Sequence, residues 1–274
     1  MTPQEKDIHD VQNFWNAHPL LTDEVETKSN TAEWFKQFDT IKNSVFLDNL
    51  EPWIGPARRS GKLSVLDVGC GPGFWNRALK DIDCIYTGID ISSESVAIAR
   101  EGQSLLGTHG KLVQGNAEQL DFPDEMFDHV ISEGVIHHTP DTQKCADEIY
   151  RVLKQGGTAT VSVYYKSFLL SPVVFPLVRT LMRIFRAGLK GRGRESMWSA
   201  KSPEEFVRMY DGAENPIGKA YSKKETLKMF EKFSTIRTST YYFPQRALPI
   251  TLPPSLLKFC DNFFGTLIRA DLTK

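Results

Sequence analysis

Cysteine is scarce in this chain of 274 residues, and its placement argues against a cross-linked or zinc-stabilised fold. No two cysteines form a C-x-x-C pair or a zinc-binding spacing, so reduced thiols in a cytoplasmic protein are the plain interpretation. We therefore expect no metal centre. The cysteines are Cys70, Cys84, Cys145 and Cys260.

An excess of charge of one sign is also lacking. The 33 Lys and Arg residues are balanced by 34 Asp and Glu residues, which leaves a net charge of −1. This balance argues against a bulk electrostatic attraction to nucleic acid, so no nucleic-acid partner is expected. The first 20 residues are polar, and no targeting segment is recognisable among them.

The apolar pattern that is present predicts an α/β fold. Residues 61–165 alternate between strand-like and helix-like segments, which demands a parallel sheet with right-handed crossovers. Two further strand-like segments near the C-terminus suit a Rossmann-like sheet of seven strands, mostly parallel, with helices on both faces and the last strand antiparallel. The expected strands are residues 63–68, 84–89, 111–115, 127–132, 157–164, 236–243 and 266–272.

Four regions follow from this pattern. Residues 1–60 are expected to form an N-terminal helical cap, and residues 61–165 the core of the sheet. Residues 166–232 interrupt the alternation and predict a helical insertion after the fifth strand, which serves as a lid on the substrate side. Residues 233–274 are expected to supply the closing strands.

A glycine-rich turn after the first strand is the most informative motif. In Val65–Trp75 the strand ends in Asp67, and Gly69, Gly71 and Gly73 follow at every second position. Backbone amides in such a turn, at the start of a helix, favour an anionic ligand group. The Gly-x-Gly-x-x-Gly spacing of dinucleotide-binding proteins is absent in either register, which argues against a nicotinamide dehydrogenase.

Polar residues also follow the next three strands, at the sheet edge where ligands of open α/β folds bind. Asp90 ends the second strand and can accept hydrogen bonds from both ribose hydroxyls of an adenosine group. Asn116 can hydrogen-bond an adenine amino group, and Ala117 leaves its backbone amide free to meet the ring. Glu133 ends the fourth strand, where a reacting group would lie.

Together these motifs resemble class I S-adenosylmethionine-dependent methyltransferases, in the small-molecule branch that includes the ubiquinone and menaquinone biosynthesis methyltransferases (the methyltransferase-11 type core). The strings VLDVGCGPG, TGIDIS, GNAEQLDF, FDHVISEGVIHH and RVLKQGGTATVSV carry the resemblance over residues 63–164. It implies S-adenosyl-L-methionine as cofactor. The implied cofactor-binding residues are Asp67, Gly69, Cys70, Gly71, Gly73, Asp90, Ile91, Asn116, Ala117, Glu133 and Trp15.

The resemblance implies direct displacement of the sulfonium methyl by a nucleophile, which depends mainly on positioning. A base assists when the nucleophile is a hydroxyl or an activated carbon. His137 and His138 are the candidate catalytic bases by position, and packing or capping is their alternative role. The acceptor is expected to be a small, partly lipophilic molecule, methylated on oxygen, carbon or nitrogen.

Residues 168–194 carry the most individual pattern. Apolar residues gather on one helical face, and six Lys or Arg residues lie between positions 179 and 194. Two interpretations stay open: a lid helix that buries its apolar face on the sheet, or a basic amphipathic helix in peripheral contact with an anionic membrane surface. Beyond this segment, Tyr210, Asp211 and Tyr221 are candidates to face the acceptor.

Two other functions remain as alternatives. A tRNA or protein methyltransferase would carry an Asn/Asp-Pro-Pro-Tyr/Phe string after the fourth strand, where this chain has Ser132–Val135. A non-catalytic scaffold protein could retain cofactor binding, but the intact glycine turn, Asp90 and Asn116 argue against a decayed site.

Overall fold

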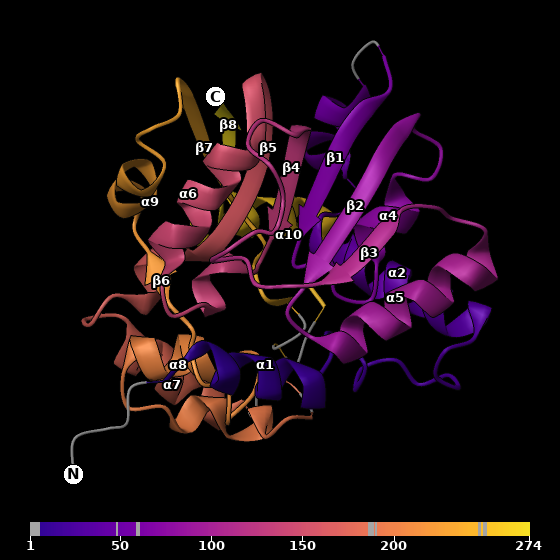
Figure 1. Ribbon diagram of the computed structural model, residues 1–274. Helices are drawn as coiled ribbons and strands as arrows, with labels where there is room; N and C mark the ends of the chain where they lie inside the picture. The colour runs from indigo at the N-terminus through magenta and orange to yellow at the C-terminus, as the bar shows by residue number, and fades with distance from the viewer. Residues whose placement is uncertain are drawn as a thin grey trace.

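The computed structural model describes residues 6–47, 49–58, 61–185, 189, 191–245, 248 and 251–274. A central sheet organises them, with strand order β3-β2-β1-β4-β5-β8-β7, and the short β6 pairs with β5 beside this path (Figure 1). The strands are β1 (Leu63–Val68), β2 (Cys84–Asp90), β3 (Lys111–Gln114), β4 (Phe127–Glu133), β5 (Leu153–Tyr165), β6 (Ala220–Tyr221), β7 (Thr235–Tyr241) and β8 (Leu267–Thr273).

The strand directions confirm the predicted Rossmann-like fold. β1 pairs in parallel with β2 and β4, and β4 pairs in parallel with β5. β8 alone runs against its neighbours, because it is inserted antiparallel between β5 and β7. The two-residue β6 is an eighth strand that the sequence pattern did not predict.

Helices cover both faces of the sheet. They are α1 (Ile8–Ala17), α2 (Ala32–Val45), α3 (Glu51–Ile54), α4 (Phe74–Ala78), α5 (Ser93–Leu106), α6 (Thr142–Val152), α7 (Phe175–Ile184), α8 (Pro203–Met209), α9 (Lys223–Met229) and α10 (Pro254–Phe264). Successive β1 side chains point to opposite faces. Val65 packs in the core cluster that includes α2 and α5, whereas Leu66 packs in the cluster that includes α6 and α9.

The insertion after β5 has a small core of its own. Phe175 of α7 and Phe206 of α8 are buried with Met197 and Trp198 of the 3-10 turn between them. Most of the remaining apolar surface of α7 stays exposed, including Leu181 at 41%. The interpretation in which this apolar face is buried on the sheet is therefore wrong for α7, which packs mainly on its own insertion.

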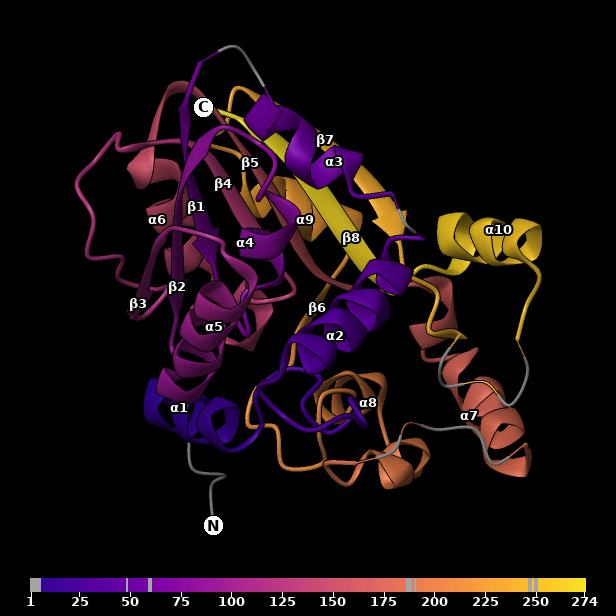
Figure 2. The ribbon, with the colours of Figure 1, turned by 90° about the vertical axis from the view of Figure 1, so that its right-hand side faces the viewer.

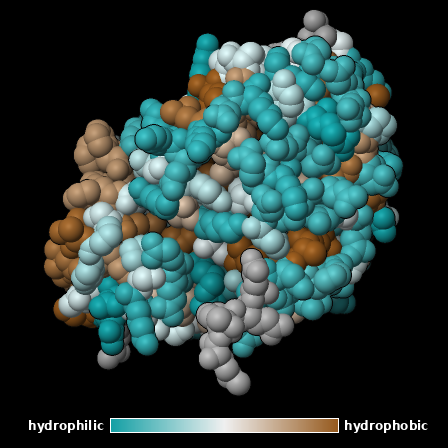
Figure 3. Space-filling view, turned by 60° about the vertical axis from the view of Figure 1, so that its left-hand side comes forward, coloured by the Kyte–Doolittle hydropathy of each residue, from teal (hydrophilic) through white to brown (hydrophobic). Residues whose placement is uncertain are grey.

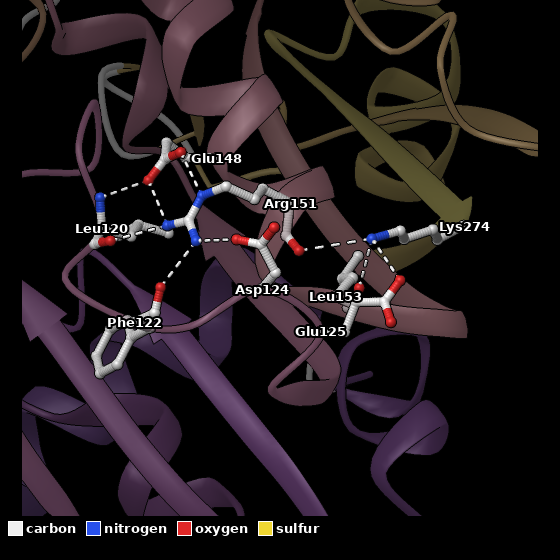
Figure 4. A network of polar contacts seen from close by, with 8 residues as sticks. All are labelled: Leu120, Phe122, Asp124, Glu125, Glu148, Arg151, Leu153 and Lys274. Carbon is white, nitrogen blue, oxygen red and sulfur yellow. Dashed lines mark hydrogen bonds and ion pairs between the residues drawn. The ribbon is translucent and has the colours of Figure 1, made fainter.

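A network of polar contacts lies beside the start of β5, at the end of the sheet opposite the glycine turn (Figure 4). The Arg151 guanidinium, at the end of α6, donates hydrogen bonds to Glu148 and Asp124 and to the carbonyls of Leu120 and Phe122, at 2.7–2.9 Å. Lys274, just beyond β8, donates to the Leu153 carbonyl at 2.7 Å. These contacts hold the C-terminal strand and α6 in place at a distance from the glycine turn.

Among the described residues, every helix falls short of the length and apolar character needed to cross a bilayer.

Candidate functional site

The glycine turn after β1 has the geometry that its sequence predicts. Gly69 has φ +79°, and a Cβ there would lie 2.2 Å from the Val135 side chain, so only glycine fits. Gly71 has φ +50°, and a Cβ there would meet no atom within 4 Å because it would project into a cavity that Gly71 lines. A ligand can therefore approach the backbone of Gly71 closely.

Asp90 ties this turn to the end of β2. One oxygen of its carboxylate accepts the Gly71 N–H and the other accepts the Ser92 N–H, both at 2.8 Å. Burial raises the pKa of Asp90, while these two amide hydrogen bonds lower it in part. Each carboxylate oxygen keeps a second acceptor position, which suits a ligand with two neighbouring hydroxyls.

Eight of the predicted cofactor-binding residues surround one cavity at the carboxyl edge of the sheet, which we call the donor cavity. They are Trp15, Gly69, Gly71, Asp90, Ile91, Asn116, Ala117 and Glu133. His138 lines it as well. The N-terminal helix α1 lies against this cavity, since the Ser92 hydroxyl donates to the Trp15 carbonyl at 3.0 Å.

The predicted residues Asp67, Cys70 and Gly73 do not line the donor cavity. Asp67 is fully buried, and one of its oxygens accepts the Tyr86 hydroxyl at 2.6 Å. Its other oxygen has no partner among the described residues, and burial raises the Asp67 pKa to about 7. Cys70 is buried, and Gly73 begins α4 with φ +84°. Direct contact of these three with a cofactor stays a prediction.

Asn116 faces the donor cavity, but its side-chain oxygen is already engaged. That oxygen accepts the Glu118 N–H at 2.9 Å and so fixes the loop after β3. An amide oxygen has two lone pairs, so a second acceptor position remains for an adenine amino group.

A second cavity adjoins the first, and we call it the acceptor cavity. The two share Leu20, Glu133 and Gly134. The acceptor cavity is otherwise lined by Leu21, Lys42, Val45, His137, Tyr164, Tyr210, Asp211, Tyr242 and Leu267. A molecule in this cavity would thus lie next to a molecule in the first.

The two candidate histidines have different environments. His137 is 1% exposed, and neither of its ring nitrogens has a hydrogen-bond partner among the described residues. Burial, followed by the nearby His138, holds the His137 pKa well below its ordinary value, which favours the neutral ring. His138 instead lies 3.2 Å from an Asp211 oxygen through Nε2, and its Nδ1 is 2.7 Å from the Ile217 carbonyl.

Asp211 anchors the wall of the acceptor cavity. Burial alone would raise its pKa, but the hydrogen bond and charge of His138 and the hydrogen bond from Tyr164 together hold it well below the ordinary value. The Tyr164 hydroxyl donates to Asp211 at 2.6 Å. Tyr210 and Asp211 therefore lie where the sequence placed them as candidates, whereas the Tyr221 hydroxyl points elsewhere and donates to Thr142 at 2.8 Å.

The sequence interpretation missed Lys42, which forms an ion pair with Glu133 at the junction of the two cavities. Both side chains are less than a tenth exposed. Lys42 falls on the buried face of α2, one turn after Phe38 and one turn before Val45. A charged residue on an apolar helical stripe is the signal that could have identified it.

The fold and the cavity at its carboxyl edge define a class of protein, and comparison with known proteins agrees. The "Methyltransferase domain" family matches residues 66–161. Those residues are a methyltransferase domain of class I, the class that uses S-adenosylmethionine as methyl donor. A solved S-adenosylmethionine-dependent methyltransferase from Methanosarcina mazei shares this fold, with a TM-score of 0.55 at 18% identity over 81% of this chain and 97% of that one.

Two curated relatives are quinone-related methyltransferases. The chain is 41% identical over 102 residues to rice 2-methyl-6-phytyl-1,4-hydroquinone methyltransferase 2, which covers 36% of this chain and 29% of that protein. It is 31% identical over 157 residues to demethylmenaquinone methyltransferase of Listeria welshimeri, which covers 55% of this chain and 66% of that protein. The chain thus spans less than two thirds of either relative.

Proposed function

We propose that this protein transfers a methyl group from S-adenosylmethionine to a small, lipophilic acceptor of the hydroquinone or phenol type. The observation that carries the proposal is the acceptor cavity, which shares Glu133 and Gly134 with the donor cavity and holds a buried, neutral His137. The quinone-related relatives support the acceptor class. S-adenosylmethionine, when bound, supplies an electrophilic methyl group.

The proposed donor site consists of the eight residues that line the donor cavity. Asp90 would accept the ribose hydroxyls, and Asn116 with Ala117 would meet the adenine ring. The backbone of Gly69 and Gly71 would lie against the amino-acid part of the donor, because glycine has no Cβ that would keep a ligand away there.

In the acceptor cavity, we assign the proton-accepting role to His137 rather than His138. Both nitrogens of His138 are already engaged, since Nε2 lies near the carboxylate of Asp211 and Nδ1 near the carbonyl of Ile217. Neither ring nitrogen of His137 has a hydrogen-bond partner among the described residues, and its neutral ring would take the proton of the substrate hydroxyl during methyl transfer. His138 and Asp211 would position the wall against which His137 packs, at a ring-centroid distance of 4.2 Å from His138.

The Lys42–Glu133 ion pair lies at the junction of the two cavities, since Glu133 lines both. A buried ammonium there would stabilise negative charge that develops on the acceptor oxygen, and Glu133 would lie close to the positive sulfonium. We also propose that residues 168–194 contact a membrane surface, as suits a lipophilic acceptor, and that the protein is otherwise cytoplasmic.

The test is to measure donor binding and methyl transfer separately. We expect calorimetry to detect binding of S-adenosylmethionine and its demethylated product, and radiolabelled donor to methylate alkyl-substituted hydroquinones. His137→Gln should lower kcat by about 100-fold, a typical contribution of a general base, with donor affinity unchanged. Transfer to amines or tRNA but to no hydroquinone or phenol would overturn the acceptor class, and full activity of His137→Gln would overturn the base assignment.

A further inference from the structure

Helix α7 presents an unpartnered apolar face to solvent. Leu177, Leu181 and Ile184 lie three or four residues apart, on one side of the helix, and are 62%, 41% and 69% exposed. Phe175, on another side, is 2% exposed and packs within the insertion. The helix is therefore anchored by one face and leaves a second apolar face free.

Helix α10 repeats this arrangement. Leu256, Phe259 and Phe263 share one helical face and are 45%, 49% and 65% exposed. The opposite side is held to the sheet, since the buried Asp261 accepts the Phe243 N–H at 2.6 Å and the Asn262 carbonyl accepts the Thr240 hydroxyl at 3.0 Å. The three exposed side chains of α10 therefore lie on a helix that is held in place by hydrogen bonds.

The two helices lie on the same side of the molecule. Figure 2 shows α7 and α10 one below the other at its right, on the side away from α5. Figure 3, which brings this side toward its left edge, shows hydrophobic side chains gathered there against a largely hydrophilic remainder. We call the six residues of these two helices the apolar surface: Leu177, Leu181, Ile184, Leu256, Phe259 and Phe263.

The charges beside the apolar surface favour an anionic lipid surface as its partner. Arg183 of α7 and Lys258 of α10 are exposed. α7 contains no acidic residue, and the one acidic residue of α10, Asp261, is buried. Exposed apolar side chains flanked by cations are the pattern by which amphipathic helices bind anionic membranes.

A third cavity lies between the acceptor cavity and α10. It lies between the end of α2 and α10, where Leu257, the neighbour of Leu256, and Asp261 line it. It shares Val45 and Tyr242 with the acceptor cavity. The acceptor cavity and the third cavity are therefore neighbours, and together they extend from Glu133 past Tyr242 to α10. The donor cavity is not part of this series.

We propose that α7 and α10 dock together on an anionic bilayer, and that the apolar tail of the acceptor passes from the bilayer through this third cavity while its ring occupies the acceptor cavity. The proposal rests on the proposed function for the identity of the acceptor. It extends the membrane contact from residues 168–194 to α10 and assigns the route of the tail.

Vesicle sedimentation tests the docking surface without any activity. Wild-type protein should bind vesicles of phosphatidylcholine with phosphatidylglycerol, and bind pure phosphatidylcholine more weakly. Leu181→Ser/Phe259→Ser/Phe263→Ser should lower binding to the anionic vesicles at least tenfold. Ile85→Ser/Leu105→Ser, which alters residues of similar exposure (56% and 49%) on β2 and α5, should leave binding unchanged. Equal binding of both variants, no binding of the wild type, or a dimer that hides this surface would overturn the docking.

The route is tested by acceptors that differ only in tail length. Leu257→Trp, which fills the third cavity, should lower kcat/KM for a long-chain hydroquinone at least tenfold and leave that for a tail-less hydroquinone unchanged. Equal effects on both would overturn the route. Wild-type protein that binds vesicles but methylates neither acceptor contradicts the proposed function and not the surface, whereas activity on both without vesicle binding contradicts only the surface.

Discussion

The donor cavity and the acceptor cavity meet at Glu133 but are built in different ways. The donor cavity takes its main residues from the ends of consecutive strands, such as Gly69, Asp90 and Asn116. The acceptor cavity brings together distant segments, among them Lys42 of α2 and Asp211 after α8. Strand ends meet because the parallel sheet requires it, whereas α2 and the insertion meet only through packing.

The pKa values of the buried aspartates near the two cavities are shifted in opposite directions. Near the donor cavity, Asp67 is buried, the Tyr86 hydroxyl is its hydrogen-bond partner among the described residues, and its pKa is raised to about 7. At the acceptor cavity, Asp211 is held as an anion by His138 and Tyr164.

The largest expected difference between the two cavities is in how their buried aspartates change the free energy of unfolding with pH. Asp67 has a raised pKa in the folded state, so the protein binds an extra proton between about pH 4 and pH 7, and the free energy of unfolding falls as pH rises through this window. The shift from 3.8 to about 7 corresponds to about 4 kcal/mol. Asp67→Asn should flatten this slope in urea unfolding measured from pH 4 to pH 7.5.

Asp211→Asn supplies the matched comparison. The pKa of Asp211 is depressed in the folded state. Its contribution to the free energy of unfolding is therefore present above about pH 4 and is lost as pH falls through the folded-state pKa. The variant should be destabilised at pH 7 and keep the pH 4–7 slope of the wild type. An Asp67→Asn variant with an unaltered slope would contradict the protonated state of Asp67.

The next effect concerns the ion pair that joins the cavities. Lys42→Met leaves Glu133 buried without its cation, and breaking a buried pair in this way costs about 3 kcal/mol of unfolding free energy. Lys42→Met/Glu133→Gln should recover most of that stability in thermal and urea unfolding, yet remain slow in methyl transfer. Recovery of activity along with stability would assign the pair to folding alone.

A smaller effect is expected for the donor cavity. Asp90→Ala should weaken S-adenosylmethionine binding at least tenfold, since hydrogen bonds to a charged group contribute about 1.5–3 kcal/mol. Asp83→Ala is the control, because Asp83 precedes the same strand and its side chain is 81% exposed. Calorimetry that shows equal affinity for folded Asp90→Ala and wild type would remove Asp90 from the site.

The smallest effect should fall outside both cavities. Arg151→Met removes the centre of the network in Figure 4, and we expect a loss of about 1–2 kcal/mol in unfolding free energy because the guanidinium is partly exposed. Donor affinity should be unchanged, since the network lies away from the glycine turn. A change in calorimetric affinity would couple this edge of the sheet to the site.

Much of the donor half could be predicted from the sequence. The predicted strand at residues 63–68 coincides with β1, and that at 127–132 differs from β4 by one residue, because buried parallel strands are continuous apolar runs. Asp90 and Asn116 could be placed because each follows such a strand. Asp67 also matched the motif, but it does not line the donor cavity, because this depends on the direction of its side chain in the folded sheet.

The acceptor half was harder to predict. His137 and His138 were indistinguishable as neighbours in the sequence, and only the position of Asp211, 73 residues beyond His138, separates them. The same holds for α7, whose amphipathic pattern predicted a helix but not which of its faces would be covered. Amphipathic periodicity indicates that a helix has an apolar face. Which segment covers that face depends on residues far away in the sequence.

By itself, the sequence determined the sheet and the glycine turn, because strand periodicity and turn chemistry depend on residues a few positions apart. The reaction class was implied by the resemblance of its motifs to a known family. The tertiary structure alone decided that Lys42 meets Glu133 and that His137 has no hydrogen-bond partner among the described residues. It also decided that α7 and α10 both expose an apolar face. These features depend on contacts between residues far apart in the chain, which no local pattern encodes.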